Sequence, residues 1–130
     1  MSQVTPVSMD GTDPAGWDAK LDSLTAAPAN HRLLYEDDSV RVLSVSIAPG
    51  ATENPHHHRW PSVFVIDSMP AKMRDFNGKG EEIPLPIPEK FELPLTVKMP
   101  PQPVHYVRNE DTLGFHGTRI EFKRGFPTDA

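Results

Sequence analysis

Histidines at two places in the sequence have the spacing of a metal-binding site. His56 and His58 lie in the segment GATENPHHHRWPS, which begins at Gly50. Alternate side chains of a β-strand share a face, so we expect His56 and His58 to point one way and His57 the other. Two imidazoles at this spacing can share one ion, and a third ligand must come from elsewhere in the fold. The candidate is His105, which follows a proline-rich turn and begins another predicted strand.

The composition limits the chemistry and the partners. The chain has no cysteine, so any metal must be held by His, Asp, Glu or backbone oxygen. The formal charge is −5, from 13 basic and 18 acidic residues without a basic block, so we expect no nucleic-acid partner. Residues 1–30 lack a secretory signal pattern, and no stretch approaches the roughly 18 apolar residues of a membrane helix. We therefore expect a cytoplasmic protein with no membrane partner.

The elements that must position these histidines are short strands. Fifteen prolines and eight glycines divide the 130 residues into short elements, because proline removes a backbone donor. Segments rich in β-branched residues alternate with turn signals such as Asn77-Gly78. This pattern predicts an all-β jelly-roll barrel or sandwich. The strands expected around the histidine segment are 31–37, 40–48, 62–68, 71–76, 81–86, 93–99, 105–109 and 113–124.

One helix is predicted before the strands. Asp13 can cap it, Pro14 suits the first helical position, and Pro28 ends it. Its apolar face consists of residues at i, i+4 and i+7, namely Trp17, Leu21 and Leu24. We expect one domain, in which an N-terminal extension over residues 1–38 packs this helix on a barrel over residues 39–126.

The two histidine segments resemble the two motifs of the cupin family. Both motifs occur in order, and the likeness spans residues 40–123. The matching residues are Gly50, His56 and His58 for the first motif, and Pro100, His105 and Asn109 for the second. The sequence is thereby identified as a small single-domain member of the RmlC-like cupin superfamily. This resemblance implies a double-stranded β-helix and implies His56, His58 and His105 as ligands of a divalent transition metal.

The sequence departs from the cupin pattern at two positions. The motif-one glutamate falls on Ser62, or on Val63 if the loop is one residue longer, and Gln102 replaces the motif-two glycine. Three neutral imidazoles would leave a divalent ion its full charge, which weakens metal binding but attracts anionic or chelating ligands. Imidazole ligands favour Fe, Zn or Ni over Mg or Ca. A pocket that has lost its metal remains an alternative.

Further residues are expected to line the pocket. Phe64 and Ile66 share their strand parity with Ser62, and should form an apolar wall. In the last strand, Ile120 and Phe122 indicate that their face points inward, which would bring a histidine on that face into the pocket. Trp60 closes the pocket mouth, fills a dimer contact or simply packs. The full set of expected pocket-lining residues is Ser62, Phe64, Ile66, Gln102, His116 and Trp60.

The function follows from the resemblance rather than from composition. Some cupin dioxygenases use three histidines, so one hypothesis is an Fe(II)-type dioxygenase acting on a small chelating or anionic substrate. The second is a non-catalytic module that binds a small metabolite, with or without metal. The third is a structural or dimerisation role. Many cupins pair edge strands, so we expect a homodimer, with a small molecule as the other partner.

Overall fold

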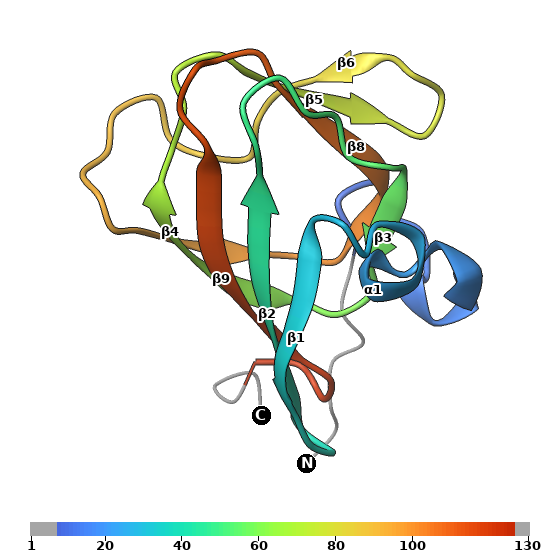
Figure 1. Ribbon diagram of the computed structural model, residues 1–130. Coiled ribbons are helices and arrows are strands. Elements are labelled where there is room, and N and C mark those ends of the chain that lie inside the picture. The colour runs from blue at the N-terminus through green and yellow to red at the C-terminus, as the bar shows by residue number, and fades with distance from the viewer. Residues whose placement is uncertain (1–7, 127–130) are drawn as a thin grey trace.

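Two antiparallel sheets face each other across the core in a computed structural model, which describes residues 8–126 (Figure 1). The five-stranded sheet has the order β1 (His31–Glu36), β2 (Val40–Ile47), β9 (Phe115–Phe122), β4 (Ser62–Ser68) and β7 (Leu95–Met99). The four-stranded sheet has the order β3 (His56–His58), β8 (Gln102–Asn109), β5 (Met73–Asn77) and β6 (Glu82–Ile83). The predicted all-β jelly-roll class is confirmed.

The inward faces of β2 and β4 supply much of the apolar core. Leu43, Val45 and Ile47 alternate along β2, and Phe64 and Ile66 alternate along β4; all five are buried. The intervening residues of these strands are more exposed, as the period of two requires when one sheet face is packed. This core forms the apolar side of the interior in which the histidines lie.

The last strand has the opposite orientation from the predicted one. In β9 the buried positions include Gly117, Arg119 and Glu121, while Ile120 and Phe122 lie on the outer face and are only half-buried. The prediction was wrong because it placed apolar residues inside and charges outside. Arg119 and Glu121 remain inside because they belong to a buried network of opposite charges, described below.

The predicted helix is broken into three short turns. They are η1 (Pro14–Gly16), η2 (Ala19–Leu21) and α1 (Ser23–Ala26). Each begins after an aspartate, because the side chains of Asp13, Asp18 and Asp22 each accept a hydrogen bond from the backbone N–H two residues on. Aspartate favours such capping over a helix interior, so each one starts a new turn. The segment packs on the barrel, where α1 lies beside β3 (Figure 1).

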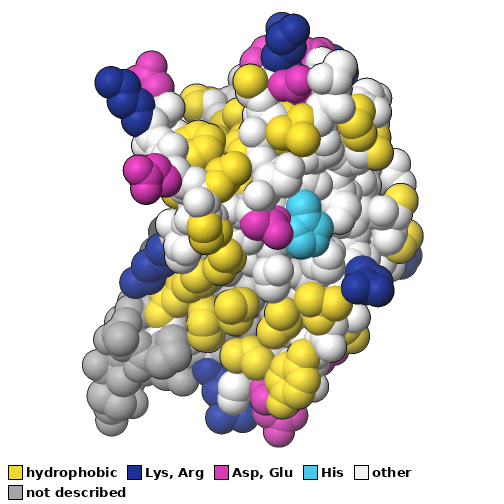
Figure 2. Space-filling view, turned by 60° about the vertical axis from the view of Figure 1, so that its left-hand side comes forward, with side chains coloured by type: hydrophobic (Ala, Val, Ile, Leu, Met, Phe, Trp, Pro, Cys, Tyr) yellow, Lys and Arg dark blue, Asp and Glu magenta, His cyan; other side chains and the backbone are white. Residues whose placement is uncertain are grey.

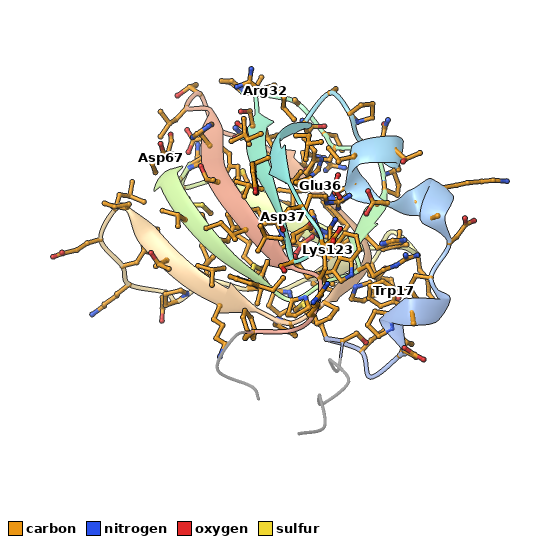
Figure 3. The ribbon with its side chains drawn as sticks, turned by 90° about the horizontal axis from the view of Figure 1, so that it is seen from below. Trp17, Arg32, Glu36, Asp37, Asp67 and Lys123 are labelled. Atoms are coloured by element: carbon orange, nitrogen blue, oxygen red, sulfur yellow. The ribbon has the colours of Figure 1, made fainter. Side chains whose placement is uncertain are left out.

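The boundary expected at residue 38 does not separate an extension from the barrel. β1 pairs with β2 throughout its length and is an edge strand of the five-stranded sheet. Lys123, after β9, ties the β1–β2 turn to the barrel, since its Nζ lies 2.6 Å from Glu36 Oε2 and donates to the carbonyl of Asp37 at 2.8 Å (Figure 3). Residues 1–7 of the expected extension lie outside the described range.

β1 exposes apolar side chains at the edge of the sheet. Leu33, Leu34 and Tyr35 are 44%, 47% and 54% exposed. The expected homodimer stays a prediction, and this edge is where it would be sought. Across residues 8–126, none of the helices has the length and apolar character needed to cross a membrane.

Candidate metal centre

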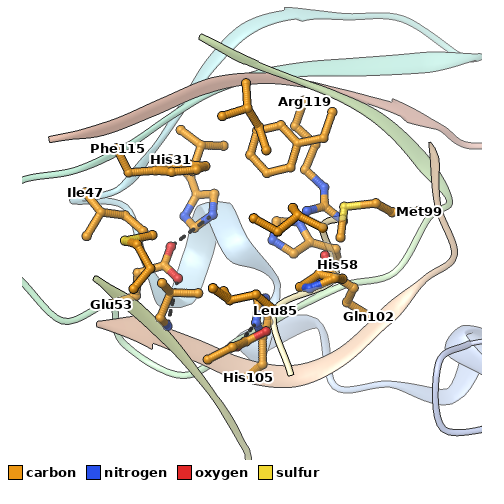
Figure 4. A pocket seen from close by; sticks show the side chains of 18 of the residues that line it. His31, Ile47, Glu53, His58, Leu85, Met99, Gln102, His105, Phe115 and Arg119 are labelled. Atoms are coloured by element: carbon orange, nitrogen blue, oxygen red, sulfur yellow. Dashed lines mark hydrogen bonds and ion pairs between the residues drawn. The ribbon is translucent and has the colours of Figure 1, made fainter. Parts of the chain in front are cut away.

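Four buried histidines from three strands converge in the interior (Figure 4). His56 and His105 are direct partners in the β3–β8 pair, and their ring centroids lie 4.8 Å apart. His31, from the start of β1, lies 4.6 Å from His56 between ring centroids. The ligand atoms of His31, His56 and His58 all lie within 4.8 Å of one another. The compact cluster of ligand atoms thus joins the expected pair with His31 in place of His105, and the His105 ring lies beside the cluster, 4.8 Å from His56 and 5.8 Å from His58 between centroids.

Each of the four rings is oriented by a hydrogen bond from its Nδ1. The acceptors are carbonyl or carboxylate oxygens, which accept and do not donate, so each Nδ1 carries a hydrogen, and in the neutral ring Nε2 then has the lone pair. The pairs are His31 with Ala27 O at 2.9 Å, His56 with Asn54 O at 2.7 Å, His58 with Glu121 Oε2 at 3.0 Å, and His105 with Asp75 Oδ1 at 2.8 Å. Metal-ligating histidines are commonly held in this way.

The Nε2 atoms of His56 and His105 are buried and have no hydrogen-bond partner within residues 8–126. A buried polar atom without a partner costs free energy, so such atoms indicate a missing ligand. Burial lowers the pKa of His31 to about 4 and holds the pKa values of His56 and His58 well below the ordinary value. These three rings are therefore neutral at pH 7, as metal ligands must be.

Glu53 brings a carboxylate into the same cluster. Its Oε1 accepts a hydrogen bond from the backbone N–H of Val107 at 3.1 Å. Its Oε2 lies 3.7 Å from Nε2 of His31 and 3.9 Å from Nε2 of His56. Burial raises the pKa of Glu53 to about 7. The motif-one position after the histidines holds no glutamate, but Glu53, three residues before His56, brings a carboxylate to the cluster from the other side of the motif.

Three of the residues expected to line the cavity do line it beside the histidines, namely Phe64, Ile66 and Gln102. The cavity volume is about 60 Å³, and its other apolar walls include Met99 and Phe115 (Figure 4). The volume is enough for an ion and a small ligand.

The remaining expected residues lie elsewhere. Ser62 is fully buried on the inner face of β4 but does not line this cavity. Trp60 also lies outside the cavity. Its ring centroid is 4.9 Å from the guanidinium carbon of Arg41 and 5.6 Å from Nζ of Lys123. His57 points away from the cavity, and its Nε2 lies 2.7 Å from the carbonyl oxygen of Asp18.

His116 was wrongly expected in the pocket. It lies on the outer face of β9, its side chain is 41% exposed, and its Nδ1 lies 2.5 Å from Asp67 Oδ1. Figure 2 shows a histidine at the surface beside an acidic side chain on this side of the molecule. The error follows from the inverted orientation of β9.

A buried network of charges borders the histidines. Arg41 donates from Nε to Glu121 Oε1 at 2.6 Å, and from Nη1 and Nη2 to the two carboxylate oxygens of Asp22 at 2.9 Å each. Glu121 in turn orients His58 through its other oxygen. Arg119 lines the cavity on the same strand as Glu121. Burial lowers the pKa of Arg119 to about 10, so it remains cationic at neutral pH.

Solved structures of low sequence identity share this architecture, whereas no family model and no curated protein matches the sequence. A cupin domain from Bordetella pertussis is similar at a TM-score of 0.56 and 18% identity, over 72% of this chain and 91% of that one. An RmlC-like cupin family protein from Methanocaldococcus jannaschii is similar at a TM-score of 0.51 and 11% identity, over 72% of this chain and 79% of that one. A protein with a double-stranded β-helix domain from Klebsiella pneumoniae is similar at a TM-score of 0.50 and 15% identity, over 72% of this chain and 76% of that one. At these identities the likeness shows the fold, and the chain therefore has the double-stranded β-helix fold of the cupin superfamily.

Proposed function

We propose that this protein binds one divalent transition-metal ion in its cavity, through His56 and His58 together with His31 and His105. The observation that carries the proposal is the common orientation of the four rings, in which each Nδ1 donates to an oxygen and leaves an Nε2 lone pair beside the same cavity. Glu53 adds a carboxylate within reach of two of these rings. We infer that it supplies the negative charge that the cupin motif places after the histidines.

The donor set favours some metals over others. Imidazole nitrogens suit Fe, Zn and Ni, whereas Mg and Ca prefer sites built from oxygen ligands. One carboxylate among several imidazoles reduces the charge of a divalent ion from +2 to +1. This charge still attracts a small anionic or chelating substrate.

We infer an oxygenase of small molecules as the reaction class. Fe(II) held by these histidines would supply the redox chemistry of an oxygenase, whereas Zn²⁺ would supply only a Lewis acid. The chain contributes the surroundings: Phe64, Met99 and Phe115 exclude bulk water from the cavity. Glu53 adds a carboxylate at the edge of the site, with Oε2 3.7 Å from Nε2 of His31 and 3.9 Å from Nε2 of His56.

The second candidate is a non-catalytic module that captures a small metabolite. The apolar lining beside a few buried polar groups supports it, because ligand sites combine these two features. In this case the histidines hold a metal that binds the metabolite without turnover, or contact the metabolite directly.

Metal content tests the proposal. Untagged protein is dialysed against a chelator, reconstituted separately with Fe²⁺, Zn²⁺ and Ni²⁺, desalted, and analysed by elemental mass spectrometry. We expect about one ion per chain. Retention of less than about one ion per ten chains for all three metals would overturn the metal site. Oxygen uptake by the iron-loaded protein with small thiols and diketones then separates the oxygenase from the binding module.

A further inference from the structure

Arg119 is a buried arginine with unpaired N–H donors on its guanidinium. The residue is only 2% exposed, yet its Nε and Nη2 have no hydrogen-bond partner in the described part of the chain. It lines the cavity together with the histidines, and Figure 4 shows its side chain extending toward them from β9. A buried cation with unpaired donors is costly, so this arrangement calls for an acceptor that the protein itself does not supply.

Glu121 does not fill that role. Its nearer oxygen lies 3.8 Å from Nε of Arg119, beyond hydrogen-bond distance. One oxygen of Glu121 is occupied by Arg41 at 2.6 Å, and the other lies 3.0 Å from Nδ1 of His58. Arg41 additionally holds both oxygens of Asp22. The carboxylates of this network are therefore committed to Arg41 and His58, and Arg119 retains free donors.

The surroundings of Arg119 describe the missing acceptor. A guanidinium presents parallel N–H groups that match the two oxygens of a carboxylate. The Phe64 ring, whose centroid is 5.3 Å from the guanidinium carbon, packs against Arg119, and Ile66 and Met99 line the cavity as well. Beyond its charged end, the ligand thus meets apolar side chains. A water molecule needs about 10–15 Å³ of such space, so a cavity of about 60 Å³ takes roughly four to six non-hydrogen atoms.

We propose that Arg119 binds the carboxylate of a small organic acid in this cavity and is the residue that selects for that class of ligand. The inference rests on the proposed function in one respect only, namely that this cavity is the ligand site. It does not require the metal, because the unpaired donors belong to Arg119 itself. Beside a bound metal, the same anchor would fix the position of the acid relative to the ion.

Propionate and propionamide are a matched pair of probes. They have the same number of non-hydrogen atoms and nearly the same shape, but only propionate carries a charge. Each is titrated into the full-length protein and followed by NMR chemical shifts, with and without metal. We expect propionate to bind at least about 10-fold more tightly than propionamide, because the bond to Arg119 is charge-assisted. Equal affinities, or tighter binding of phosphate or chloride than of propionate, would overturn the proposal.

The buried Arg119 and the exposed Arg74 provide matched arginine variants. Arg119→Gln should abolish the preference for propionate, and Arg119→Lys should retain part of it, since lysine keeps the charge without the planar donors. Arg74→Lys should keep the full preference, because the Arg74 side chain is exposed and does not line the cavity. Near-UV circular dichroism checks that each variant is folded. If Arg119→Gln does not fold, the comparison of Arg119→Lys with Arg74→Lys decides, and equal preferences in these two would overturn the assignment.

The outcomes separate this inference from the proposed function. Metal binding without a preference for propionate refutes the role of Arg119 and leaves the metal site standing. A preference for propionate that depends on Arg119, in protein that retains no metal, refutes the metal site and leaves the carboxylate site standing.

Discussion

His105 donates a hydrogen bond from Nδ1 to Oδ1 of Asp75 over 2.8 Å, and both residues are buried. β8 supplies the histidine and β5 supplies the aspartate, so the bond joins two neighbouring strands of one sheet. It fixes the hydrogen on Nδ1 and leaves Nε2 without a partner among the described residues. The aspartate thereby holds the ring in the orientation and tautomer that a metal ligand requires.

Asp75→Asn is therefore expected to weaken metal binding about 10- to 100-fold, because an amide orients the ring less strongly than a carboxylate does. Competition with a chromogenic chelator measures the affinity. Asp67→Asn is the matched control, since Asp67 forms the corresponding pair with the exposed His116 outside the cavity. Equal affinities of the two variants would show that His105 is not a ligand.

His31 and His57 are both buried histidines, but only His31 faces the cavity. We expect His31→Ala to lower metal affinity, because the ring lies with His56 and His58 in one cluster of ligand atoms. His57→Ala should leave the affinity unchanged, since its ring packs against Trp17. Metal titration of both folded variants distinguishes them. An unchanged affinity in His31→Ala would confine the site to the residues expected from the sequence.

Gly117 makes room for the Phe64 ring in the core. A Cβ at this position would lie 2.4 Å from Cε1 of Phe64 and 3.1 Å from the carbonyl oxygen of Val65. Gly117→Ala should reduce the free energy of unfolding by about 1–3 kcal/mol through overpacking. Gly16→Ala is the control, because no described atom lies within 4 Å of its added Cβ, and its effect should stay within about 0.5 kcal/mol. Urea denaturation gives both values, and similar values would contradict the packing argument.

Arg41 joins the N-terminal segment to the barrel through its bonds to Asp22 and Glu121. Arg41→Gln should destabilise the protein by about 3–5 kcal/mol, because it leaves Glu121 buried without its cationic partner. Arg74→Gln, which removes the ion pairs of an exposed arginine with Glu82 and Glu110, should cost less than about 1 kcal/mol. Thermal and urea unfolding provide the comparison. A small loss in Arg41→Gln would mean that this network contributes little to stability.

The strands could be predicted from the sequence because local signals specify them. The alternation in β2 and β4 and the Asn77-Gly78 turn reflect interactions between near neighbours in the chain. In β9 the same reasoning failed. Glu121 is buried because Arg41 and His58 reach it from other strands, and Nε of Arg119 lies 3.8 Å from the same carboxylate. A period-two pattern does not reveal which face a paired charge occupies.

Some residues of the candidate site could likewise be predicted from the sequence, and others could not. The spacing of His56, His58 and His105 could be read directly, and the β3–β8 pair brings His105 beside His56, although the compact cluster of ligand atoms contains His31 instead of His105. His31 belongs to no motif, and it joins them only because β1 lies at the edge of the opposite sheet. Glu53 lies three residues before His56, so an acidic residue within the histidine segment was the one available signal.

Anomalous diffraction from crystals of the zinc-loaded protein tests the central claim most directly. We expect one anomalous peak in the cavity, about 2.0–2.1 Å from Nε2 of His56 and of His58 and at the same distance from Nε2 of His31, of His105 or of both. A cavity without a peak in zinc-loaded crystals, or a peak bound only to surface groups such as His116 and Asp67, would contradict it.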